Sequence, residues 1–78
     1  MRYTAELVVI NAQGEYRIPH GLGGSQQWHR KYETARRAAD AAARRLLKRG
    51  ADQVVVRVLQ RIGVGQLFEV GSVTPDAK

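Results

Sequence analysis

The sequence predicts an α+β domain with the order ββ-α-ββ, in which one alanine-rich helix packs on one face of an antiparallel sheet. Two observations predict this fold class. Four short stretches are rich in β-branched and other apolar residues, two before and two after a single stretch of alanine and arginine. Residues that favour turns separate the stretches of each pair. The chain has 78 residues, and we expect one domain over residues 1–74 with a loose tail over residues 75–78.

The first two strands form a hairpin in this prediction. Residues 2–10 are rich in Tyr, Thr, Leu, Val and Ile, which favour a strand, and residues 11–14 favour a turn. The returning strand covers residues 15–18. It ends at Pro19, because proline has no N–H to donate to a neighbouring strand.

The helix follows a connection of two parts. We expect a flexible glycine-rich loop over residues 20–25 and a further short extended piece over residues 26–31. Thr34 is the expected N-cap of a helix over residues 35–49, which Gly50 ends. Alanine and leucine at three- and four-residue spacings predict a shallow apolar stripe that lets this helix lie close to a sheet. The stripe consists of Ala35, Ala38, Ala39, Ala42, Leu46 and Leu47.

The last two strands form a second hairpin. Residues 53–62 alternate most clearly, and residues 66–73 follow after a turn at residues 63–65. One face of the first of these strands is apolar and the other is mixed. Val54, Val56 and Val58 share the first face, and Gln53, Val55, Arg57, Leu59 and Arg61 share the second. In the last strand we expect Phe68 and Val70 to face the core.

The whole net charge of +6 lies in one short stretch. Residues 30–49 contain eight basic and two acidic residues, so 8 − 2 = +6, and elsewhere five basic residues balance five acidic ones. The two acids, Glu33 and Asp40, stand four residues before Arg37 and Arg44, and such helical pairs are worth about 0.3 kcal/mol each. A charge distribution this uneven predicts a polyanionic partner.

The expected binding residues are the single tryptophan and these eight cations. Arginine and lysine neutralise phosphates, and an aromatic ring stacks on bases. Trp28 and Tyr32 also interleave with basic residues, as in nucleic-acid-binding surfaces. The alternative interpretation is a solvated helix face with both rings packed at the edge of the core. The candidate site residues are Trp28, Arg30, Lys31, Arg36, Arg37, Arg44, Arg45, Lys48 and Arg49.

The sequence does not predict catalysis, a metal site or a cofactor. The two histidines, His20 and His29, stand nine residues apart, and there is no cysteine to complete a structural zinc site. Ser25 lacks the strand-to-helix elbow and the orienting carboxylate that a histidine-activated nucleophile needs. The glycines of residues 21–24 stand about ten residues before the expected helix, too far for a phosphate-binding loop. We therefore expect a protein that is not an enzyme.

The expected location is the cytoplasm, without membrane attachment. The longest apolar run covers residues 7–10, whereas a membrane-spanning helix needs roughly 20 apolar residues. The first residues also lack the hydrophobic region of a signal peptide. The absence of cysteine fits a reducing compartment.

Part of the sequence resembles a known DNA-binding domain. Residues 28–39 read WHRKYETARRAA, which is similar to the W-x-x-x-[FY]-[DE]-T-A-x-x-A-A junction of ethylene-response-factor-type domains. Residues 2–7, RYTAEL, resemble the R-W-x-A-E-I strand of that family, and arm-binding domains of phage integrases have a related three-strand-plus-helix fold. The resemblance implies that the sheet enters the DNA major groove with the helix behind it. The matching strand positions are Arg2, Glu6, Trp28 and Arg30, and the matching helix-packing positions are Ala38 and Ala39.

Other features leave further functions open. The family's first, arginine-rich strand is missing here, and two strands follow the helix. A short, cysteine-free ββ-α-ββ chain is also typical of small phage proteins, some of which are anti-CRISPR inhibitors that bind a protein or nucleoprotein complex. A third hypothesis is a homodimer without a ligand, paired through the strand around residues 57–59, through the last strand, or through the half-apolar second face that carries Val55 and Leu59. A non-catalytic nucleic-acid-binding protein remains the first hypothesis.

Overall fold

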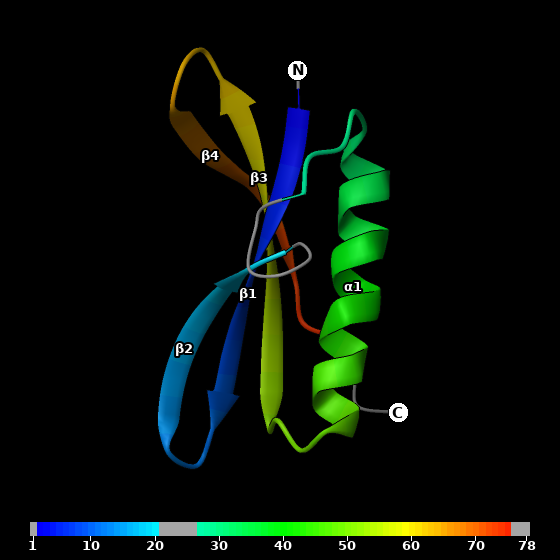
Figure 1. The fold of residues 1–78 in the computed structure, drawn as a ribbon, viewed down its shortest axis with the longest axis vertical. Helices are drawn as coiled ribbons and strands as arrows, with labels where there is room; N and C mark the ends of the chain where they lie inside the picture. The colour runs from blue at the N-terminus through cyan, green and yellow to red at the C-terminus, as the bar shows by residue number, and fades with distance from the viewer. Residues whose placement is uncertain (1, 21–26, 76–78) are drawn as a thin grey trace.

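The computed structural model describes residues 2–20 and 27–75, which form one four-stranded antiparallel sheet and one helix (Figure 1). The predicted α+β class and the ββ-α-ββ order are confirmed. The sheet order is β2-β1-β3-β4, so β1 and β3 are central and β2 and β4 are the edges. Helix α1 runs along one face of the sheet (Figure 1). The elements are β1 (Arg2–Asn11), β2 (Gly14–Pro19), α1 (Tyr32–Lys48), β3 (Gln53–Ile62) and β4 (Gln66–Val73).

Strands β3 and β4 have the predicted bounds, whereas the start of the helix was predicted wrongly. α1 begins at Tyr32, and its N-cap is Lys31, which is extended and makes no capping hydrogen bond with its side chain. Thr34 therefore lies inside the helix. Packing fixes the earlier start, because the Tyr32 ring meets the Tyr3 ring edge-to-face with centroids 6.2 Å apart. α1 ends at Lys48, one residue before the predicted end, and Gly50 follows the C-cap with a φ of 113°, as predicted.

The core lies between α1 and the two central strands. Alternate residues of β1 and β3 face the helix, and small alanines on α1 allow a close approach. The helix residues that are fully buried follow a four-residue spacing, so the buried stripe passes through Ala43 while Ala38, Ala42 and Leu46 lie half-buried beside it. The buried cluster consists of Ala5, Leu7, Val9, Ala35, Ala39, Ala43, Leu47, Val54, Val56 and Val58.

The expectation that Phe68 and Val70 face the core is wrong. Phe68 is 49% exposed and Val70 is 42% exposed. Phe68 pairs with Gln60 and shares the helix-side face, but α1 begins over Gly71, so Phe68 lies beyond the start of the helix. The register shifts between Val58 and Leu59, which leaves Val70 as the extra residue of a bulge.

The connection before α1 adds a short piece to the edge of β1. The backbone N–H groups of Tyr3 and His29 each donate to the other residue's carbonyl oxygen, both at 2.7 Å. The buried Thr4 hydroxyl donates to the Gln27 carbonyl oxygen at 2.8 Å. The expected extended piece is thus present as a single bridge, and it fixes Trp28 beside β1. The glycine-rich loop over residues 21–25 lies outside the described residues.

The end of the described chain packs against the fold. Pro75, which we expected in a loose tail, is buried. The other expected tail residues, 76–78, lie outside the described residues.

Candidate functional site

Six of the nine candidate residues lie on α1 or at its C-cap. The buried stripe fixes the rotation of the helix, so its remaining positions point sideways or away from the sheet. Arg36 is half-buried and the other five side chains are exposed. These six residues are Arg36, Arg37, Arg44, Arg45, Lys48 and Arg49. The structure therefore places six of the nine predicted residues along the flanks and the outer side of α1.

Acidic neighbours compensate the first half of this surface. Glu33 pairs with Arg36 at 2.9 Å and with Arg37 at 3.8 Å. Asp40 pairs with Arg44 at 2.9 Å. Both predicted pairs with a four-residue spacing are thus confirmed, and the pair of Glu33 with Arg36, at a three-residue spacing, is additional. The hydrogen bond from Arg36 lowers the pKa of Glu33, so this carboxylate stays charged, and the same bond raises the pKa of Arg36.

The C-terminal end of α1 is not compensated in this way. Among the residues that the structure describes, no ion pair involves Arg45, Lys48 or Arg49. These three exposed side chains lie within one and a half turns, beside the negative end of the helix dipole, which favours cations. We name this set of three residues the C-terminal cation cluster. It is the most concentrated uncompensated positive charge on α1.

A cavity lies beside the C-terminal cation cluster. Its volume is about 240 Å³, and Arg45 and Arg49 line it together with apolar side chains of β1, β2 and α1. His20 also lines the cavity and is only 7% exposed. Burial lowers the pKa of His20 first, followed by the nearby His29 and Arg45, so this imidazole is neutral at pH 7.

The two histidines do not form a metal centre with other described residues. The rings of His20 and His29 are stacked, with centroids 5.6 Å apart and an angle of 18° between the planes. Within residues 2–20 and 27–75, no group of three or more potential ligands comes together around them. Ser25, the other residue considered with these histidines, lies outside the described residues.

The remaining candidates are not part of the same surface. Trp28 is half-buried, and the Arg61 guanidinium carbon lies 5.7 Å from the centroid of its ring. Because Arg61 alternates with the core-facing valines of β3, Trp28 lies on the side of the sheet away from α1. Arg30 and Lys31 are exposed in the chain that enters α1. The structure thus separates Trp28 from the C-terminal cation cluster.

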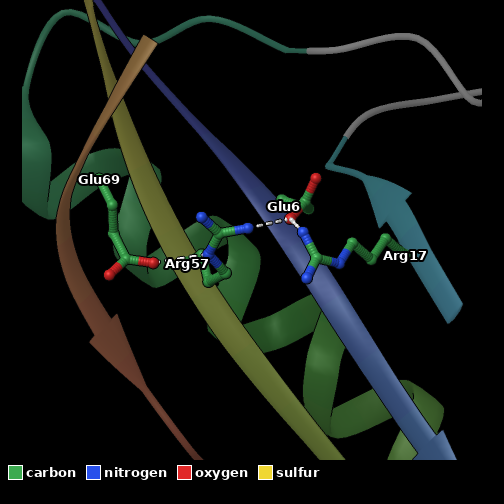
Figure 2. A network of polar contacts seen from close by, with 4 residues as sticks. All are labelled: Glu6, Arg17, Arg57 and Glu69. Atoms are coloured by element: carbon green, nitrogen blue, oxygen red, sulfur yellow. Dashed lines mark hydrogen bonds and ion pairs between the residues drawn. The ribbon is translucent and has the colours of Figure 1, made fainter. Parts of the chain in front are cut away.

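The face away from α1 carries an ion-pair network that the sequence analysis missed (Figure 2). Arg57 donates to Glu69 and to Glu6, both at 2.5 Å, and Arg17 lies 3.6 Å from Glu6. Bonds to the two carboxylates raise the pKa of Arg57, with Glu69 as the larger cause. The alternation of residues along β1 and β3 places Glu6 and Arg57 on this face. This alternation is the feature of the sequence that could have predicted the network. The network balances much of the charge on the open sheet face.

Comparison with known proteins adds no family. No protein family model, no curated protein and no solved structure matches this chain. Within the described residues, no helix combines the length and the apolar character that a membrane crossing requires.

Proposed function

We propose that this protein is a non-catalytic nucleic-acid-binding protein that contacts backbone phosphates with α1. The observation that carries the proposal is the C-terminal cation cluster, whose three exposed side chains form no ion pair with any described residue. Phosphates attract such cations because binding releases counterions from the nucleic acid. The location that goes with this proposal is the cytoplasm.

The spacing along α1 suits contact with a phosphate backbone. Residues 45, 48 and 49 are neighbours on one side of a helix, where side chains three and four positions apart lie side by side. The guanidinium groups of Arg45 and Arg49 offer planar forks of donors to phosphate oxygens. Lys31 lies at the other end of α1, about 25 Å away by helix rise, and adds a further basic residue.

The compensated arginines also support the proposal. Arg37 and Arg44 have side chains that are 78% and 48% exposed, and their ion pairs follow the helix surface. Exposed pairs of this kind contribute about 0–1 kcal/mol, so a phosphate can replace the carboxylate at little cost. Up to six phosphates can therefore be engaged along the helix.

The charge balance favours the helix over the sheet as the docking surface. The resemblance to domains that bind DNA through their sheet assigns DNA contacts to Arg2, Glu6, Trp28 and Arg30. In the structure Glu6 instead binds Arg57 and Arg17. Arg57 and Arg17 on the open sheet face are therefore already engaged by carboxylates, whereas no described acid lies within ion-pair distance of the C-terminal cation cluster.

We propose a protein without catalytic activity because arginines bind four of its carboxylates. Glu6, Glu33, Asp40 and Glu69 are all held by arginines. These ion pairs engage the oxygens of the four carboxylates and so disfavour a role for them as proton donors or acceptors to a substrate.

Fluorescence anisotropy with labelled duplex DNA, single-stranded DNA and RNA at low salt tests the proposal. We expect wild-type protein to bind at least one of the three nucleic acids. The variant Arg45→Gln/Lys48→Gln/Arg49→Gln should lose at least tenfold in affinity. The matched variant Arg36→Gln/Arg37→Gln/Arg44→Gln removes the same charge from the compensated part and should lose less.

Two results would contradict the proposal. One is the absence of binding to any of the three nucleic acids at low salt. The other is an equal loss in the two variants, since the C-terminal cation cluster would then have no special role. A loss that follows Trp28→Ala/Arg30→Gln instead would move the interface to the open sheet face.

A further inference from the structure

Among the described residues, most of the large apolar side chains that are exposed to solvent lie on the β3–β4 hairpin. Ile62, Val64, Leu67, Phe68 and Val70 are between 41% and 94% exposed, and the sixth such residue, Tyr16, lies on β2. The turn of this hairpin projects past the start of β1 (Figure 1). Apolar side chains occur on both of its faces, because Leu67 pairs with Arg61 and Phe68 with Gln60.

Strand β4 is also an open sheet edge. It pairs with β3 on one side and with no described strand on the other, so backbone N–H and C=O groups remain available along that side. The two edges of the sheet differ in how they are protected. β2 is short, with six residues, it carries the charged residues Glu15 and Arg17, and it ends in Pro19. Each of these features discourages the addition of another strand.

β4 has fewer such devices. Its eight residues include no lysine, arginine or proline, and its single charge, Glu69, is already bound to Arg57. The bulge at Val70 interrupts the edge but leaves residues 66–69 regularly paired with β3. The edge from Gln66 to Glu69 is therefore open, regular and flanked by apolar side chains.

The charge distribution indicates which partner this edge accepts. Residues 62–73 contain one acid and no base, whereas the surplus charge of +6 lies in residues 30–49. Two copies of the chain repel each other wherever their α1 surfaces meet. The β4 edge itself adds no such repulsion, because its one charged residue, Glu69, is compensated by Arg57.

We infer that the β4 edge pairs with the β4 edge of a second copy to form a homodimer. Antiparallel pairing about a twofold axis perpendicular to the sheet joins two four-stranded sheets into one of eight strands. A stable interface needs about 800 Å² from each partner. The surface described for this chain is 5334 Å², so the edge and its apolar side chains need to supply about one seventh of it.

The symmetry has a consequence for the basic surface. A twofold axis perpendicular to the sheet keeps both copies of α1 on the same side of the joined sheet. The dimer therefore presents two C-terminal cation clusters in one direction. The dimer itself does not depend on the proposed function, and nucleic-acid binding does not require it.

Sedimentation velocity of the full chain, without nucleic acid, tests the inference from low micromolar to a few hundred micromolar protein. We expect wild-type protein to shift to twice the monomer mass as concentration rises. Phe68→Lys places a charge beside the edge and should remain monomeric across the range. Tyr16→Lys is the matched control, because Tyr16 is 48% exposed on the other edge and should leave the dimer intact.

A second measurement covers the case in which Phe68→Lys fails to fold, as judged by circular dichroism. Amide hydrogen exchange of wild-type protein should then slow with concentration in residues 66–69 and not in residues 14–19. A wild-type chain that is monomeric at every concentration overturns the inference. So does a folded Phe68→Lys variant that still dimerises, or a dimer that Tyr16→Lys disrupts while Phe68→Lys does not.

Discussion

The Tyr32 side chain covers Gly71 so closely that a Cβ atom fits beneath it only if the ring moves. A Cβ atom at position 71 would overlap the Tyr32 hydroxyl oxygen and would lie 3.2 Å from two carbon atoms of the ring. Tyr32 also packs edge-to-face against Tyr3, which restricts how far the ring can move away. This contact fixes the first turn of α1 against edge strand β4.

Gly71→Ala should destabilise the fold by about 1–3 kcal/mol, the usual cost of adding a methyl group to a tightly packed site. Urea unfolding followed by circular dichroism measures the change. Tyr32→Phe removes the overlapping oxygen, so Gly71→Ala should cost clearly less in that background. An equal cost in both backgrounds would show that the hydroxyl group does not set the fit.

Ala39 allows α1 to lie close to the sheet, since its side chain is fully buried in the centre of the helix. Ala39→Leu should lower the free energy of unfolding by about 1–3 kcal/mol, because the larger side chain forces α1 away from the sheet. Ala41→Leu is the matched control on the exposed side of the same helix, where leucine costs little. Thermal unfolding compares the two, and a similar effect of both substitutions would contradict the close packing.

Arg57 joins β1 and β4 through two carboxylates (Figure 2). Arg57→Met should cost about 1–2 kcal/mol, because it leaves the half-buried Glu6 and its neighbour Glu69 without this donor. Arg17→Met should cost under about 0.5 kcal/mol, since the Arg17 side chain is 58% exposed and lies 3.6 Å from Glu6. Urea unfolding tests this ranking, and a reversed order would contradict it.

His20 should make the protein less stable in mild acid. Burial, His29 and Arg45 hold the pKa of His20 below its ordinary value of 6.5, so the unfolded chain binds a proton more readily than the folded chain. Stability is then complete above pH 6.5 and falls as the pH drops through the lowered folded value. Melting temperatures between neutral and mildly acidic pH should fall less steeply for His20→Gln than for wild-type protein. Parallel pH profiles would contradict a protonation at this residue.

The fold was predictable from sequence because its strands have one clear period. The alternating valines of β3 identified the central strand and its buried face, and glycines at 50, 63 and 65 marked the helix end and the second hairpin turn. The prediction of the helix start was wrong because it relied on Thr34, a favourable capping residue. The packing of Tyr32 against Tyr3 outweighs that preference and starts the helix earlier. Phe68 and Val70 were assigned to the core because a pattern of alternation shows neither the bulge nor which part of the sheet α1 covers.

The candidate site was predictable only in part. Clustering along the chain identified the cations of α1, and four-residue spacing identified the partners of Arg37 and Arg44. The separation of Trp28 from the helix depends on the bridge between Tyr3 and His29, a contact between distant segments. The partners of Arg57 likewise come from two other strands, and their pairing depends on register. The nucleic-acid function and the homodimer remain proposals.

The salt dependence of nucleic-acid binding tests the central claim most directly. Affinity for the tightest-binding nucleic acid should be measured between about 50 mM and about 200 mM salt. The logarithm of the association constant against the logarithm of salt concentration should fall with a slope of about −5 if six phosphates are engaged, and the slope should become shallower by about 2 to 3 in Arg45→Gln/Lys48→Gln/Arg49→Gln. A slope near zero, or an unchanged slope in that variant, would contradict the account.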